Sequence, residues 1–109
     1  MLFTCKEDFL RKAAECKRLS REEERALALA AAGGDTAARE KIICSYLPLA
    51  AAHIRKMPKD MQTLELIYRF VSSLEKAVES FDFLQEREEF SRRLGLVFRK
   101  ETVRYIAEK

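Results

Sequence analysis

The side chains able to catalyse a reaction or bind a metal ion are few and scattered in this sequence. His53 is its only histidine, and no CxxC pair accompanies it. The carboxylates at 22–24 diverge by about 100° per residue on a helix, which suits a helix N-terminus rather than a metal ion. No glycine-rich phosphate loop and no serine–histidine–aspartate grouping is present. We therefore expect no catalytic residue, no metal, no cofactor and no enzymatic activity.

The three cysteines, Cys5, Cys16 and Cys44, are an odd number at wide spacing. Such a pattern is typical neither of a disulfide framework nor of a zinc site. Scattered cysteines commonly serve as small hydrophobic core residues in a reducing compartment. We therefore expect three thiols in a cytoplasmic protein, and the lack of a charged and then apolar leader after Met1 favours the same compartment.

Basic residues gather near the end of the chain. Over 92–109 six Lys or Arg stand against two Glu, a net charge of +4 within a chain whose total is only +3. Basic side chains on one surface bind phosphates and release counterions, but a solvated helix face has the same composition. The residues that we consider for DNA binding are Arg92, Arg93, Arg99, Lys100 and Arg104.

The elements that position these residues are predicted to be helices. Apolar residues recur every three or four positions over 2–17, 43–57, 64–81 and 90–105, which is the helical period. The alternation typical of strands is short everywhere. The sequence therefore predicts an all-α fold, a compact bundle of about five helices, with the helix over 63–81 at the centre of the core.

Helix ends are also indicated locally. Ser20 and Glu23 have the spacing of a capping box, and the pair Gly33-Gly34 is suited to ending the helix that they begin. Asp35 is then a suitable N-cap for a third helix, which we expect to run to about Lys56.

The length and composition fit one helical domain over 1–109. The chain has 109 residues, of which 48% are hydrophobic, enough for one modest core. Its longest uncharged run, 42–54, contains Pro48 and is shorter than the about 20 residues that cross a membrane. We therefore expect no contact with a membrane.

Several segments occur in an order that resembles the sigma-70 family of bacterial RNA polymerase sigma factors. Residues 9–24 resemble that family's Y-L-x-x-I-G…L-T-x-E-E-E pattern, residues 34–40 its G-D-x-x-A-R-E turn, and residues 46–49 the segment that follows. The most specific likeness is of Leu-Glu-Leu-Ile at 64–67 and of 74–82 to L-D-L-I…G-L-x-x-A-V-E-K-F-D. By this resemblance, residues 1–34 correspond to family region 1.2 and residues 35–109 to region 2.

The resemblance implies a function in transcription initiation. In that family the domain docks on the clamp-helix coiled coil of the largest subunit of core RNA polymerase, which here implies Glu65, Tyr68 and Arg69 as polymerase-binding residues. It also captures the non-template strand of the minus-ten promoter element, which implies promoter DNA as a partner of the basic residues named above. The alternative is a sigma-derived protein-interaction or regulatory module without promoter melting, with Tyr68, Phe70 and Val71 as its apolar contact surface.

Where the family has Q-E-G-N after L-D-L-I, this sequence has Tyr-Arg-Phe-Val at 68–71, and it departs from the family in two further places. The aromatic pattern Y-A-x-W-W is replaced by Arg-Leu-Gly-Leu-Val at 93–97, so the side chains that stack on melted bases are missing. No helix-turn-helix of the kind that reads the minus-thirty-five element follows within these 109 residues.

Overall fold

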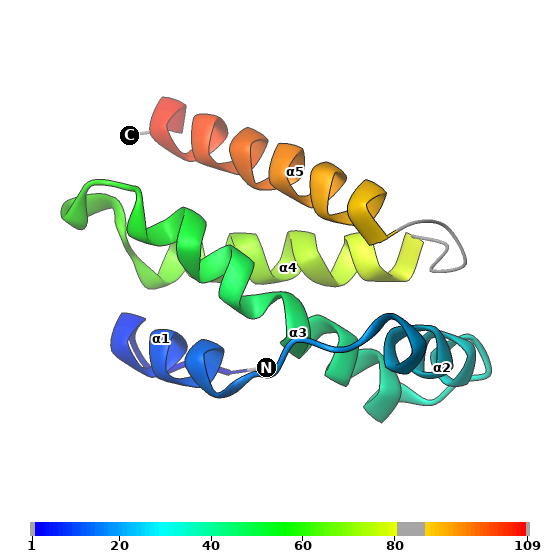
Figure 1. Ribbon diagram of the computed structural model, residues 1–109. Helices are drawn as coiled ribbons and strands as arrows, with labels where there is room; N and C mark the ends of the chain where they lie inside the picture. Colours follow the sequence, from blue (N-terminus) through cyan, green and yellow to red (C-terminus); the bar gives the residue numbers. More distant parts are fainter. Residues whose placement is uncertain (1, 81–86, 109) are drawn as a thin grey trace.

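Five α-helices make up the described part of the chain (Figure 1). The structure is a computed structural model that describes residues 2–80 and 87–108, and only the backbone of residues 87–89. The helices are α1 (Lys6–Glu15), α2 (Arg21–Ala32), α3 (Thr36–Arg55), α4 (Leu64–Ser80) and α5 (Arg87–Glu108), with a 3₁₀ turn at Lys59–Met61. The described residues contain no strand, and the predicted all-α bundle of about five helices is confirmed. Residue 81, the last residue of the helix predicted over 63–81, lies outside the described residues.

Short-range hydrogen bonds and a glycine set the start and end of α2 and the start of α3. The Ser20 hydroxyl accepts a hydrogen bond from the Glu23 amide, and the Glu23 carboxylate accepts one from the Ser20 amide, each at 3.1 Å. The predicted capping box is thus confirmed. Gly34, with φ of 102°, occupies the left-handed region after α2, and the Asp35 carboxylate accepts from the Ala38 amide at the start of α3.

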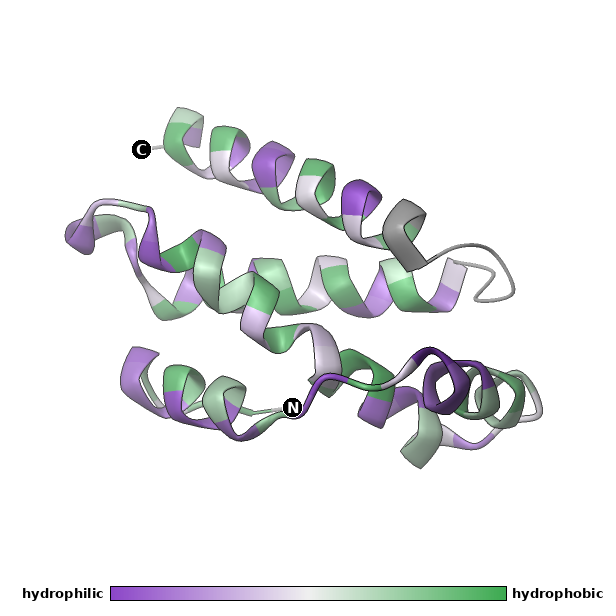
Figure 2. Cartoon of the chain, in the orientation of Figure 1, coloured by the Kyte–Doolittle hydropathy of each residue, from purple (hydrophilic) through white to green (hydrophobic). Residues whose placement is uncertain are grey.

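The core lies where α3 and α5 pack against α4. On α4 the buried residues follow the helical period, and Figure 2 shows apolar and polar positions alternating along it. They are Leu66, Ile67, Phe70, Val71, Leu74 and Val78. The Phe70 ring stacks on Phe98 of α5 with centroids 4.7 Å apart, and Tyr46 of α3 meets Phe90 of α5 edge to face at 4.9 Å. Aromatic contacts therefore join all three helices.

The prediction of three free cysteine thiols was wrong. Cys16, which directly follows α1, forms a disulfide with Cys44 in α3, and Cys5 is exposed. None of the three is a fully buried core residue. The pairing depends on the packing of α1 against α3, which brings two residues 28 positions apart into contact. No such proximity is visible in the sequence.

Hydropathy along the helices shows one further property. None of the described helices is both long enough and apolar enough to cross a membrane.

Candidate functional site

Helix α5 places the predicted DNA-binding residues on its outer side. Phe90, Leu94, Phe98 and Tyr105 are fully buried and form the inner side of the helix. Because successive residues are about 100° apart, the basic residues between them point away from the core. All five of the predicted residues are exposed: Arg92, Arg93, Arg99, Lys100 and Arg104. Arg104 also pairs with Glu101 at 3.4 Å, on the side of α5 that faces α4.

The aromatic residues of α5 take no part in this surface. Phe98 lies against Phe70 and against the His53 ring, at 4.7 and 5.3 Å between centroids, and the Tyr105 hydroxyl is 2.6 Å from that of Thr63. Burial, together with the charge of Lys56, lowers the pKa of His53 and favours its neutral form. Helix α5 therefore offers cations for phosphate groups but, among its described side chains, no exposed aromatic ring on which a base would stack.

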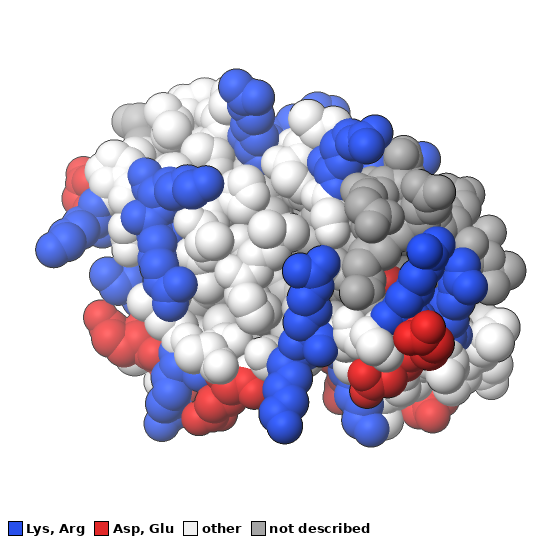
Figure 3. Space-filling model, viewed as in Figure 1, with Lys and Arg blue, Asp and Glu red and all other residues white. Residues whose placement is uncertain are grey.

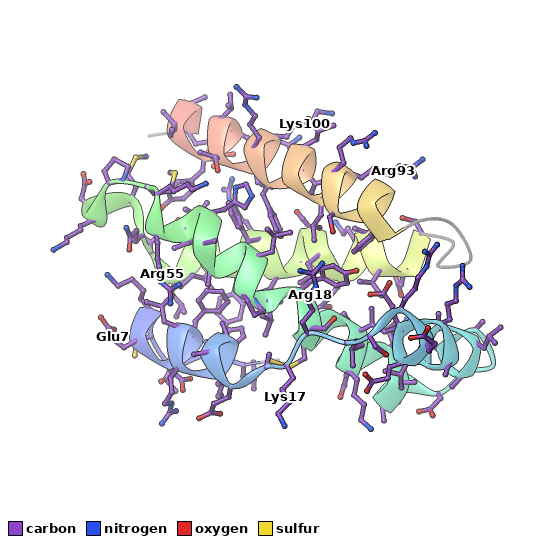
Figure 4. The ribbon with its side chains drawn as sticks, viewed as in Figure 1. Glu7, Lys17, Arg18, Arg55, Arg93 and Lys100 are labelled. Atoms are coloured by element: carbon purple, nitrogen blue, oxygen red, sulfur yellow. A yellow bond between two sulfur atoms is a disulfide. The ribbon has the colours of Figure 1, made fainter. Side chains whose placement is uncertain are left out.

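Two basic residues from other parts of the chain share one face of the molecule with α5. Figure 4 shows Arg18, between α1 and α2, and Arg55, at the end of α3, on the same side as Arg93 and Lys100. All four are exposed. In Figure 3 the Lys and Arg side chains of this face surround an uncharged centre, and the acidic side chains lie toward its lower edge and rim. We use the name basic face for the set formed by Arg18, Arg55 and the five exposed cations of α5, of which Figure 4 labels Arg93 and Lys100.

Sequence reasoning missed Arg18 and Arg55. Each belongs to a pair of adjacent cations near a helix end, at 17–18 and at 55–56, with no local pattern that distinguishes it from other exposed cations such as Arg25. The position of Arg18 depends on the packing of α1 and α2 against α3, and that of Arg55 relative to α5 on the packing of α3 and α5 against α4.

The predicted polymerase-binding residues have different roles. Tyr68 is half-buried, and its hydroxyl bonds to the backbone of Phe3. The Arg69 guanidinium bonds to Glu108 of α5 and to Glu65, and lies 5.3 Å from the Tyr105 ring. The bond to Glu108 is the main cause that raises the pKa of Arg69. Tyr68 and Arg69 thus hold helices together, and Glu65, whose side chain is 54% exposed, remains accessible.

The three residues predicted to bind polymerase line a groove between α4 and α5. It has a volume of about 640 Å³, and its lining includes Glu65, Tyr68 and Arg69 from α4 together with Arg104 and Glu108 from α5. Acidic and basic side chains are mixed here, so the groove itself is a poor site for a chain of phosphates. The phosphate-binding candidate is the basic face apart from Arg104, which lies in this groove.

The apolar surface predicted for a protein partner is not exposed on α4. Phe70 and Val71 are both buried, against α5 and within the core cluster. The prediction was wrong because these residues belong to the same helical stripe as Ile67 and Leu74, which points inward.

Comparison with protein-family models and with curated proteins finds no match to this chain. Within the part of the chain that the structure describes, no three His, Cys, Asp or Glu residues are grouped so that they would hold a metal ion. The basic face is therefore the candidate site with the strongest geometric support.

Proposed function

We propose that this chain is a sigma-70-like region 2 module of bacterial transcription initiation, acting in the cytoplasm by binding core RNA polymerase and promoter DNA rather than by catalysis. The observation that carries the proposal is the exposure of five cations on α5, together with the exposed Arg18 and Arg55 on the same side as Arg93 and Lys100 (Figure 4). The order of motifs along the sequence supports the choice of this family.

The nucleic-acid contact in this proposal is made to phosphates. Arginine and lysine position a nucleic-acid backbone without reading its bases, and their contacts make affinity depend steeply on salt. The burial of Phe90, Phe98 and Tyr105 argues against capture of unstacked bases by α5. The module thus holds the promoter strand that another part of the transcription complex opens.

The polymerase contact in this proposal centres on Glu65. It lies in the first turn of α4, is exposed, and has Arg69 as a neighbour that is itself fixed by Glu108. Tyr68 and Arg69 position α4 relative to the N-terminal segment and α5, and Glu65 is the residue that meets the partner.

Two measurements test the proposal separately. A labelled single strand with the minus-ten sequence should bind the full chain at low salt, and log affinity should fall linearly with log salt concentration. Purified core polymerase should retain the wild-type chain, and Glu65→Lys should abolish retention while helical content by circular dichroism is unchanged. Glu75→Lys, also exposed on α4, is the matched control and should be retained. Absence of both interactions would refute the proposed function.

A further inference from the structure

The outer side of α5 carries large apolar residues as well as cations. Leu96, Val103 and Ile106 are 59%, 63% and 48% exposed, and together with Leu2 and Leu29 they are the exposed large hydrophobic residues of the described chain. Three of these five therefore lie on a single helix. Cations that bind phosphates have no need of such neighbours, so the apolar residues call for another explanation.

Leu96, Val103 and Ile106 share a heptad pattern with two arginines. Arg92, Leu96, Arg99, Val103 and Ile106 are separated by alternate steps of four and three residues. Such a stripe stays on one side of a helix and is the seam along which a second helix packs. We call these five residues the outer stripe; from first to last it extends about 21 Å along the helix axis.

Gly95, beside the outer stripe, independently supports a contact between α5 and a second helix. It lies in the interior of α5 without a positive φ, and glycine there destabilises a helix relative to alanine. A Cβ at Gly95 would meet no described atom within 4 Å, so packing within the described chain does not require glycine. A glycine that is unnecessary for the fold is suited to close approach of a helix from outside the chain.

The charges around the stripe select the kind of partner. Arg93, Lys100 and Arg104 each follow a stripe residue by one position, and Arg92 and Arg99 belong to the stripe itself. A second copy of this chain would place these cations against one another, which opposes self-association. Carboxylates on a partner helix would instead face these cations, apart from Arg104, which pairs with Glu101 on the side toward α4.

We propose that the outer stripe and Gly95 form a docking site for an acidic amphipathic helix of a protein partner. Apolar side chains of that helix pack on Leu96, Val103 and Ile106, and its flanking carboxylates pair with the cations of α5. The site does not depend on the proposed nucleic-acid function, but both use the same cations, so the helix and a nucleic acid exclude each other.

The test uses designed peptides as probes. The first is a labelled three-heptad peptide with Leu at the seam and Glu at the flanking positions, which repels itself at neutral pH. The second keeps Glu but has Gln at the seam, and the third keeps Leu but has Lys at the flanks. Fluorescence anisotropy with the full chain should show binding of the first peptide at least tenfold tighter than of either other peptide.

Variants of the chain locate the site. The triple variant L96Q/V103Q/I106Q should weaken binding of the first peptide at least tenfold, whereas L29Q, which changes an equally exposed leucine on α2, should leave it unchanged. Gly95→Ala should raise thermal stability and weaken peptide binding, a pair of effects that misfolding does not produce. Equal binding of the Leu and Gln peptides, wild-type affinity in the triple variant, or loss of DNA affinity alone in that variant would each overturn the proposal.

Discussion

The Tyr68 hydroxyl donates a hydrogen bond to the Phe3 carbonyl and accepts one from the Phe3 amide, each at 2.9 Å. It thereby ties the segment before α1 to the second turn of α4, across 65 positions of sequence. Phe3 itself is buried and packs edge to face on Phe9 of α1. One hydroxyl thus satisfies both polar groups of a residue whose side chain belongs to the core.

Tyr68→Phe should therefore destabilise the fold. The substitution leaves the Phe3 amide and carbonyl without this partner in a partly buried position, and we expect the free energy of unfolding to fall by about 1–2 kcal/mol. Urea unfolding followed by circular dichroism measures the change. Ser72→Ala, exposed on the same helix, should change the free energy by less than about 0.5 kcal/mol. A Tyr68→Phe variant as stable as wild type would show that water replaces the hydroxyl at no cost.

Local features of this fold could be predicted from the sequence, because their causes lie within a few residues. The capping box of Ser20 and Glu23, the glycine after α2 and the buried stripe of α4 depend on helical periodicity and short-range hydrogen bonds. For the same reason, the exposure of the α5 cations follows from the spacing of Phe90, Leu94 and Phe98.

Contacts between residues far apart in the sequence could not be predicted from such local patterns. The pairing of Cys16 with Cys44 and the bond from Arg69 to Glu108 join residues 28 and 39 positions apart. They depend on how whole helices pack, and periodicity does not specify helix packing. For the same reason, sequence periodicity could not predict that Arg18 and Arg55 belong to the basic face, or that Tyr68 has a structural role.

The disulfide should contribute strongly to stability. Closing a loop between residues 28 positions apart restricts the unfolded chain, which corresponds to about 3–4 kcal/mol of stabilisation. Dithiothreitol should therefore lower the urea midpoint of the wild type, and the double variant Cys16→Ser, Cys44→Ser should have a low midpoint with or without reductant. Cys5→Ser should behave as the wild type because Cys5 is exposed and outside the pair. Titration of three free thiols in the unreduced native protein would contradict the pairing.

Asp8 should make stability depend on acid pH. The hydrogen bond from the Thr4 amide, assisted by Arg11 and Lys12, lowers the pKa of Asp8 from 3.8 to about 2. Since the depressed pKa means that the ionised form stabilises the folded state, its contribution is complete well above pH 3.8 and is lost as the pH falls through about 2. Asp8→Asn should thus be less stable than wild type at pH 7, and the difference should shrink as the pH falls through about 2 and disappear below it. Urea midpoints measured across this range would show the convergence, and a constant difference at all pH values would contradict it.

The position of the cations, rather than their number, should determine nucleic-acid affinity. Arg99→Ala with Lys100→Ala removes two exposed charges from the basic face, and Arg25→Ala with Lys41→Ala removes two exposed charges from α2 and the first half of α3. In Figure 1 α2 and α5 lie on opposite sides of α4, so the second pair is the matched control for net charge.

Anisotropy titrations of a labelled single strand at several salt concentrations distinguish the two pairs. The α5 double variant should bind more weakly, and the slope of log affinity against log salt should become shallower by about 0.7 for each phosphate that the variant no longer neutralises. The control pair should keep the wild-type slope, because charges remote from the bound strand release no counterions from it. Equal weakening by both pairs would mean that the strand responds only to net charge, and the basic face would then be an ordinary solvated surface.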